Sequence, residues 1–329
     1  MRIIYHCPRG LHAFAAAWLH LGLGRHLPAP DRVPLPPPGR LRYLGDDPAG
    51  NRVYILARAA LGGVATRALS GVACVFGLPL NELLLVDAAP PPAPAGAPLW
   101  ARGAAPGELL PRWDRERLER LVRATALKSR RASGSRGPVV SAPLPTVFYV
   151  CYGSAHSSVV AAAIHTGVLP SHRRATAREI TALPDFDRLE NSRIGTPVFS
   201  GADAAGREVY ALGLASGRKL LVRTIHDLLE ELGLGPGSVH FADALEGANW
   251  AIRVGGFLSR RLGLVRLGRP VCTWGVIADY PRFQRLVRET MAALGAIDSR
   301  PPVADNSGDV REEPAWGDEL EAGPGGADN

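Results

Sequence analysis

The chain has 329 residues, of which 46% are hydrophobic and 21% are charged. This composition is typical of a soluble globular protein with room for two domains of ordinary size. The net charge of +7 comes almost wholly from arginine, because lysine occurs only at Lys128 and Lys219. No aromatic-and-basic motif accompanies the arginines, so the charge does not favour a nucleic-acid partner. The segment from Asp298 onward is acidic instead, with nine Asp or Glu residues against two arginines.

Cysteine usage and hydropathy narrow the class of protein further. The four cysteines form no Cys-x-x-Cys pair; they are Cys7, Cys74, Cys151 and Cys272. This spacing predicts neither a zinc site nor a disulfide framework. The first residues lack the pattern of a secretion signal, and no apolar stretch reaches the length of a membrane span. We therefore expect a cytoplasmic protein without a membrane partner.

Residues 1–127 predict one α/β unit. The expected elements are strands at 2–7, 51–56 and 83–86, and helices at 11–23, 64–76 and about 111–127. Alternating strands and helices are typical of a parallel sheet covered by helices. Residues 88–107 are rich in Pro, Ala and Gly, a composition that cannot pack a core. A basic linker is expected over 128–145.

Residues 146–297 predict a fuller copy of the same unit. The expected elements are strands at 146–151, 208–212, 239–242 and 270–274, and helices at 157–166, 176–182, 217–232, 249–262 and 279–294. The tail over 298–329 has no periodicity and is expected to be disordered. The predicted fold class is therefore α/β, with two tandem three-layer domains, each a mainly parallel sheet flanked by helices.

A repeated pattern supports the tandem arrangement. Each half places a cysteine at the end of an apolar run and a histidine five residues later, as Cys7 and His12 and as Cys151 and His156. In the first half, an alanine and a phenylalanine follow the histidine where the second half has two serines. We therefore expect the first half to be a pseudo-domain that packs on the second, and the chemistry to lie in the second half.

The segment Cys151–Ser158 is the main candidate site. It joins an apolar strand to a helix, whose first N–H groups lack internal partners and whose dipole favours an anion. Gly153 lets a ligand approach the backbone. Ser154, Ser157 and Ser158 supply hydroxyl donors. The pattern predicts a phosphate-binding loop, and the alternative is a tight turn in which Ser157 is the helix N-cap.

Two residues of this segment are candidate catalytic groups. Cys151 lies beside a helix N-terminus, where a thiol can act as a nucleophile, although an apolar-flanked cysteine can also be a plain core residue. His156 could transfer a proton or orient a ligand. Its counterpart His12 persists without the serines, which favours a structural hydrogen bond as the alternative. His20 and His165 lie inside apolar helices and are expected in the core.

Other polar residues could join the site from later in the chain. Asp243 ends an apolar strand, and ligands of open parallel sheets bind beyond such strand ends. Its carboxylate could hold Mg²⁺ or cap the following helix. Arg260 and Arg261, with Arg269 nearby, could neutralise a phosphate or could simply be solvated. The complete P-loop motif is absent from the chain, so the cofactor stays unknown, with Mg²⁺ as one option.

Separated blocks of the second half resemble a known family. The blocks that resemble the domain of unknown function 3189 are 150–158, 161–165, 206–210, 255–263 and 268–271. The resemblance implies a relation to small single-domain proteins of clostridia-like bacteria, whose activity is not established. Residues 1–127 resemble a diverged copy of the same domain. The resemblance therefore indicates a family and leaves the function open.

A shorter stretch is similar to an enzyme family. Residues 150–153 resemble the opening of low-molecular-weight phosphotyrosine phosphatases, but Ser157 stands where those enzymes carry an arginine that clamps the phosphoryl group. The sequence thus predicts binding of a phosphate-bearing or other anionic small molecule. If the protein is an enzyme, phosphoester hydrolysis or phosphoryl transfer is expected. The alternative is a non-catalytic regulatory or protein-interaction module with a structural loop.

Overall fold

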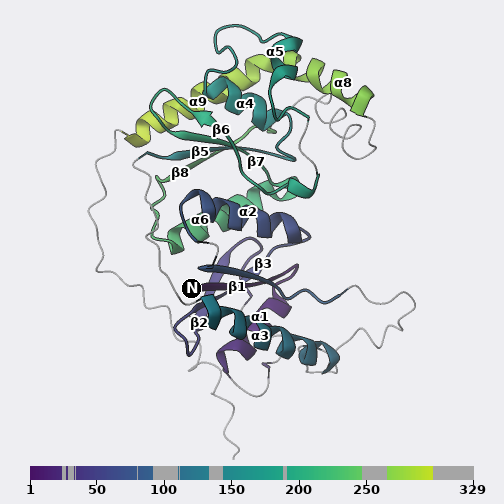
Figure 1. The fold of residues 1–329 in the computed structure, drawn as a ribbon, viewed down its shortest axis with the longest axis vertical. Helices are drawn as coiled ribbons and strands as arrows, with labels where there is room; N and C mark the ends of the chain where they lie inside the picture. Colours follow the sequence, from purple (N-terminus) through teal and green to yellow (C-terminus); the bar gives the residue numbers. More distant parts are fainter. Residues whose placement is uncertain are drawn as a thin grey trace, which may run out of the picture.

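The computed structural model describes residues 1–23, 27–28, 33, 35–79, 81–91, 110, 112–132, 144–187, 191–246 and 265–298. Two sheets, each flanked by helices, give an α/β fold in two halves (Figure 1). The predicted fold class is therefore confirmed.

The first half is built on one four-stranded sheet. Its elements are β1 (Arg2–Cys7), α1 (Leu11–Leu21), β2 (Leu41–Asp46), β3 (Arg52–Ala57), α2 (Gly62–Val75), β4 (Leu83–Asp87) and α3 (Arg112–Ala132). The strand order is β2-β3-β1-β4, in which β1 runs parallel to β3 and β4 while β2 pairs antiparallel with β3. Helices α1 and α3 cover one face, and α2 covers the other (Figure 1).

The second half repeats this topology. Its strands are β5 (Thr146–Cys151), β6 (Val198–Ala202), β7 (Glu208–Gly213) and β8 (Val239–Asp243), and its helices are α4 (Ser157–His165), α5 (Ala177–Ala182), α6 (Arg218–Glu231), α8 (Val265–Ala278) and α9 (Tyr280–Asp298). Two short 3-10 helices lie at Asn191–Arg193 and Ala215–Gly217. The strand order β6-β7-β5-β8 places β5 in the centre, as β1 is in the first half. Both central strands are nearly continuous apolar runs because both of their faces are covered.

The same buried hydrogen-bond chain occurs in both halves. It joins a tyrosine of the central strand, a histidine of the next helix and an aspartate of the turn between two antiparallel strands; the members are Tyr5, His20 and Asp47, and Tyr149, His165 and Asp203. The tyrosine Oη to histidine Nδ1 distance is 2.7 Å in both halves. The histidine Nε2 to aspartate Oδ2 distances are 3.0 and 3.3 Å. Both histidines are thus core residues, as expected.

The two halves share one hydrophobic core. Helices α2 and α6 lie side by side between the two sheets (Figure 1). The packing is close, because a Cβ added to Gly217 would overlap with the Leu61 side chain. Tyr54 donates a hydrogen bond from Oη to Glu231 Oε2 at 2.6 Å across the boundary. The first half therefore covers an apolar face of the second.

The structure differs from the sequence-based expectation in two features. The antiparallel edge strands β2 and β6 were not predicted. The strand expected at 270–274 is wrong, because these residues lie inside α8. Within α8, the neighbouring Cys272 and Thr273 are both buried with Val276, while Trp274 is exposed, a spacing that fits one face of a helix and breaks the alternation of a strand.

Other expectations concern the ends and joints of the halves. Helix α3 continues to Ala132, into the first residues of the segment expected to be a linker. The helix expected at 249–262, the Pro-rich part of the first half beyond residue 91, and the acidic tail from 299 lie outside the described residues. In the described part of the chain, every helix is too short or too polar to span a lipid bilayer.

Candidate functional site

The candidate site of the second half lies where the central strand ends. Cys151 is the last residue of β5, and α4 begins at Ser157. In the sheet register, Cys151 lies beside Gly213 of β7, and the preceding Val150 lies beside Asp243 of β8. The sheet thus brings Asp243 to the same edge as the Cys151–Ser158 segment.

The sulfur of Cys151 is held by polar groups of this segment. The Ser154 N–H donates a hydrogen bond to Cys151 Sγ at 3.1 Å, and Ser158 Oγ lies 3.0 Å from the same sulfur. Cys151 and Ser158 are both buried. The thiol is therefore part of a defined polar cluster and is not surrounded by apolar side chains alone.

Ser154 has an unusual backbone and an unusual side chain. Its φ of 53° lies in the left-handed region, which favours glycine. The residue is 1% exposed, and its Oγ has no hydrogen-bond partner among the described residues. The equivalent residue of the first half is Gly10, with a φ of 87°, and its N–H donates to Cys7 Sγ at the same 3.1 Å. The turn geometry is thus retained in both halves, while the serine is specific to the second.

The N-terminus of α4 is not capped by the side chain of its N-cap residue. His156 is the N-cap residue, and its side chain makes no capping hydrogen bond. The alternative in which Ser157 caps the helix is therefore wrong, since Ser157 is the first helical residue. Gly213 lets the segment pack against the end of β7, because a Cβ there would fall 2.8 Å from the Gly153 carbonyl carbon.

His156 is fixed by a residue that the sequence did not point to. Its Nε2 lies 3.1 Å from Asp187 Oδ1, and the Asp187 N–H donates to the Ala155 carbonyl at 3.0 Å. The ring also packs edge-to-face on Phe186. Asp187 follows α5 in an irregular loop, and no periodicity or spacing distinguishes it from the neighbouring Asp185.

Asp243 has two sets of partners. Arg218, the first residue of α6, donates from Nε to Asp243 Oδ2 at 2.9 Å. The other oxygen, Oδ1, accepts from the N–H groups of Leu245 at 2.9 Å and Glu246 at 3.2 Å. Asp243 therefore caps the turn after β8, as the alternative interpretation held, and it also neutralises an arginine that the sequence did not single out.

The described residues do not test the three arginine candidates. Arg260 and Arg261 lie outside the described residues, and Arg269 lies in α8. Within the described ranges, no group of three or more His, Cys, Asp or Glu residues is arranged to hold a metal ion.

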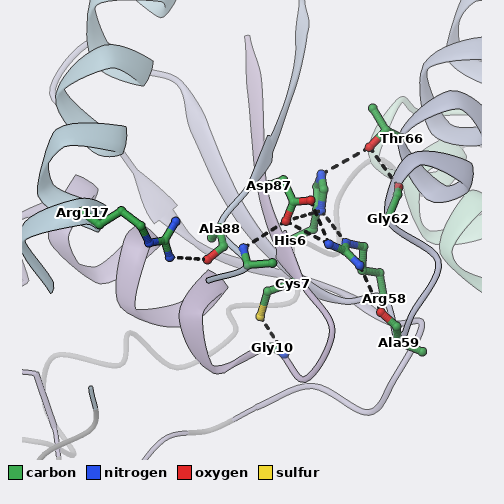
Figure 2. Close-up of polar contacts among 11 residues, drawn as sticks. His6, Cys7, Gly10, Arg58, Ala59, Gly62, Thr66, Asp87, Ala88 and Arg117 are labelled. Carbon is green, nitrogen blue, oxygen red and sulfur yellow. Dashed lines mark hydrogen bonds and ion pairs between the residues drawn. The ribbon is translucent and has the colours of Figure 1, made fainter. Parts of the chain in front are cut away.

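The corresponding strand ends of the first half carry a different polar cluster (Figure 2). The Arg58 guanidinium donates to both carboxylate oxygens of Asp87, at 2.9 and 2.8 Å, and to His6 Nδ1 at 2.9 Å. Burial lowers the pKa of His6 to about 4; Asp87 opposes this shift and Arg58 adds to it. The second half has Val150 and Leu214 at the positions of His6 and Arg58, so this cluster is specific to the first half.

One protein family matches the chain. The model of the family described as protein of unknown function (DUF3189) matches residues 2–93 and 146–292. Each matched stretch contains one of the two sheets, in agreement with the tandem arrangement. No curated protein and no solved structure gives a significant match.

Proposed function

Because the chain belongs to the DUF3189 family, whose description assigns no activity, we propose its function from the site itself: the second half binds a small phosphate-like anion at the Cys151–Ser158 segment. The ligand class follows from the groups that are present. Hydroxyls and backbone N–H groups are donors, and a cluster of donors favours a ligand rich in acceptor oxygens.

Ser154 carries this proposal. A left-handed backbone costs a residue with a side chain about 1–2 kcal/mol, and a buried hydroxyl without a partner costs about 1–3 kcal/mol. The second half accepts both costs at one residue, whereas Gly10 avoids both in the first half. A ligand oxygen that accepts a hydrogen bond from Ser154 Oγ removes the second cost. It also explains why a serine occupies a position suited to glycine.

The start of α4 supports the same conclusion. The first N–H groups of a helix have no internal acceptor, and the helix dipole favours negative charge there. His156, the N-cap residue of α4, makes no capping hydrogen bond from its side chain. Asp243 does not repel an anion strongly, because Arg218 neutralises its carboxylate. The exposed Tyr152 marks the side of the segment that faces solvent.

The proposal extends to phosphoryl transfer through Cys151. Ser158 Oγ lies 3.0 Å from Cys151 Sγ and can donate to a thiolate. In this step the Cys151 thiol passes its proton to His156, the sulfur forms a bond to phosphorus, and the bond from phosphorus to the leaving oxygen breaks. The leaving oxygen takes a proton from His156. Water then hydrolyses the S–P bond, which releases phosphate and restores the thiol.

Calorimetric titration with inorganic phosphate, with and without Mg²⁺, tests the binding site. We compare the wild type with Ser154→Gly and with Ser200→Ala, a matched control on the edge strand β6. A hydrogen bond to a charged group contributes about 1.5–3 kcal/mol, so we expect Ser154→Gly to weaken phosphate binding by about 10- to 150-fold and Ser200→Ala to leave it unchanged. Equal affinity of all three proteins, or no binding by the wild type, would contradict the proposal.

Hydrolysis of p-nitrophenyl phosphate separates transfer from binding. We expect Cys151→Ser to bind inorganic phosphate but to release no p-nitrophenol above the buffer rate. If Cys151→Ser is as active as the wild type, the thiol is not the nucleophile, and the binding site stands without it.

A further inference from the structure

The first half contains a cysteine, a histidine and an aspartate in hydrogen-bonded series. Cys7 is the last residue of β1, and His12 lies in the first turn of α1, where its side chain interacts with the Cys7 thiol closely enough to lower the pKa of that thiol. On its other side, His12 Nε2 lies 2.6 Å from Asp114 Oδ2. These residues lie outside the segment to which the proposed function refers.

Asp114 is held firmly in place. It comes from the first turn of α3, which packs on α1, and its side chain is 1% exposed. Arg117 donates from Nε to Asp114 Oδ1 at 2.6 Å, and its Nη2 donates to the Ala88 carbonyl after β4 at 2.8 Å. The carboxylate is therefore ionised and oriented, so it fixes the tautomer and the direction of the His12 ring.

The electrostatics favour a thiolate beside an imidazolium. Burial alone would lower the pKa of His12, but its hydrogen bonds to Asp114 and Cys7 raise the pKa to about 9. Burial alone would raise the pKa of the Cys7 thiol, but hydrogen bonds from the His12 side chain and from the Ala13 and His12 N–H groups bring it below its ordinary value. The Gly10 N–H adds another donor to the sulfur at 3.1 Å.

The second half lacks this series for identifiable reasons. Phe14 stands in the first half where Ser158 stands in the second; phenylalanine cannot contact the sulfur with a hydroxyl, so the polar side-chain partner of Cys7 is the histidine. In the last helix of the second half, Gln284 follows the Pro-Arg-aromatic run that Asp114 follows in α3, and it donates to backbone carbonyls instead. His156 is held by Asp187.

We propose that Cys7, His12 and Asp114 form a second site, which cleaves small activated acyl compounds such as esters and thioesters. Cys7 Sγ attacks the carbonyl carbon and forms a C–S bond. The bond from the carbonyl carbon to the leaving group breaks, and the His12 imidazolium gives that group its proton. Water then attacks the thioester while His12 takes a proton from it, and the acid leaves as the thiolate is restored.

The burial of the series sets the size of its substrate. Cys7 is 0% exposed, whereas the His12 side chain is 20% exposed. A substrate therefore approaches at the His12 edge, and the site accepts a small acyl group. Asp114 touches no substrate and acts as a positioning residue, through His12. On this proposal the first half is a diverged site, in place of the inert copy that its sequence predicted.

Two measurements on the full chain test the proposal. The first is the thiolate absorbance near 240 nm as a function of pH, for the wild type, Cys7→Ser and the control Cys74→Ser, which removes an exposed thiol. We expect thiolate absorbance below the ordinary range of thiol ionisation, about pH 8.5, that is lost in Cys7→Ser and kept in Cys74→Ser. Equal absorbance in Cys7→Ser would overturn the ion pair.

The second measurement is the cleavage of p-nitrophenyl acetate. We expect Cys7→Ser to lose the activity and Cys74→Ser to retain it. Asp114→Asn keeps the shape of the side chain, and we expect it to slow cleavage by about 100-fold or more. We also expect its pH profile to narrow, with the acid limb moved to higher pH and the alkaline limb to lower pH, which a purely structural aspartate would not cause. Cleavage by Cys7→Ser at the wild-type rate would overturn the nucleophile. An unshifted profile in a folded Asp114→Asn would overturn its positioning role.

Discussion

The central strands of the two halves end in the same backbone geometry but present different chemistry. At the end of β1, a histidine lowers the pKa of the Cys7 thiol; at the end of β5, the sulfur of Cys151 lies against the hydroxyl of Ser158. In both, a loop N–H donates to the sulfur at 3.1 Å. The comparison shows that the duplicated scaffold fixes where the sulfur lies, while the first turn of the next helix decides what the sulfur contacts.

The last strand of each sheet likewise ends in the same residue type but finds its partner elsewhere in the chain. Asp87 and Asp243 both end their strands and both pair with an arginine. The arginine is Arg58, directly after β3, in the first half, and Arg218, at the start of α6, in the second. The aspartate at the strand end is thus neutralised in both halves, but by an arginine from a different position of the chain.

The core shared by the two halves gives the largest expected effect. Phe148 is 0% exposed and stacks on Tyr210 and Phe241 with ring centroids 5.2 Å away. We expect Phe148→Ala to lower the free energy of unfolding by about 3–5 kcal/mol, measured by urea denaturation. The exposed Phe199 provides the control, Phe199→Ala, for which we expect a much smaller change. Because the two halves share this core, we expect the protein to unfold in one transition. Two separate transitions would show that the halves unfold independently.

The two arginines should differ in their contribution to stability. Arg58 is buried and serves both Asp87 and His6, so its loss leaves a buried ring nitrogen without its donor. We expect Arg58→Ala to lower the free energy of unfolding by about 2–4 kcal/mol. Arg218 is partly exposed and has one carboxylate partner, so we expect Arg218→Ala to cost about 1 kcal/mol or less. Similar losses in urea denaturation would show that the two pairs are equivalent.

His6 should make the stability of the protein fall at low pH, an effect that Val150, its counterpart in the second half, cannot produce. The pKa of His6 in the folded protein, about 4, is below the unfolded value of about 6.5. Protonation therefore favours unfolding, and stability falls as the pH drops from about 6.5 towards 4. His6→Val introduces the residue of the second half, Val150, and we expect it to reduce this fall by about 1–3 kcal/mol. Urea denaturation of the wild type and of His6→Val at pH 7, 5.5 and 4.5 measures this difference. If the free energy of unfolding falls equally in both proteins, His6 is not the group responsible.

Much of the fold could be predicted because its central strands and helices are marked by local patterns in the sequence. The runs at Arg2–Cys7 and Thr146–Cys151 are mostly apolar, and a helix follows each after a short polar turn. The edge strands could not be predicted in the same way. Each is short and half-exposed, with a bulge next to Gly45 in β2 and Gly201 in β6. Their pairing depends on contacts with β3 and β7 that no local pattern records.

Only the parts of the site that come from one continuous segment of the chain could be predicted from the sequence. The strand-terminal cysteine and aspartate follow from the order of elements, and the sheet register places Val150 beside Asp243. The partners of the histidines do not follow, because Asp114 and Asp187 come from distant elements in unremarkable sequence. The left-handed backbone of Ser154 also has no sequence signal, since glycine is the residue expected there.

The most direct test of the anion site is the free energy of unfolding of Ser154→Gly, measured with and without inorganic phosphate. Without phosphate, we expect the variant to be more stable than the wild type by about 1–4 kcal/mol, because glycine removes the cost of the left-handed backbone and of the unpartnered hydroxyl and adds only the entropy of a more flexible unfolded chain. With phosphate at a hundred times the wild-type dissociation constant, we expect the wild type to gain about 2.7 kcal/mol and the variant, which binds about 10- to 150-fold more weakly, to gain only about 0.3–1.4 kcal/mol. A variant that is less stable without phosphate, yet gains as much from it as the wild type, would show that Ser154 serves the fold and not a ligand.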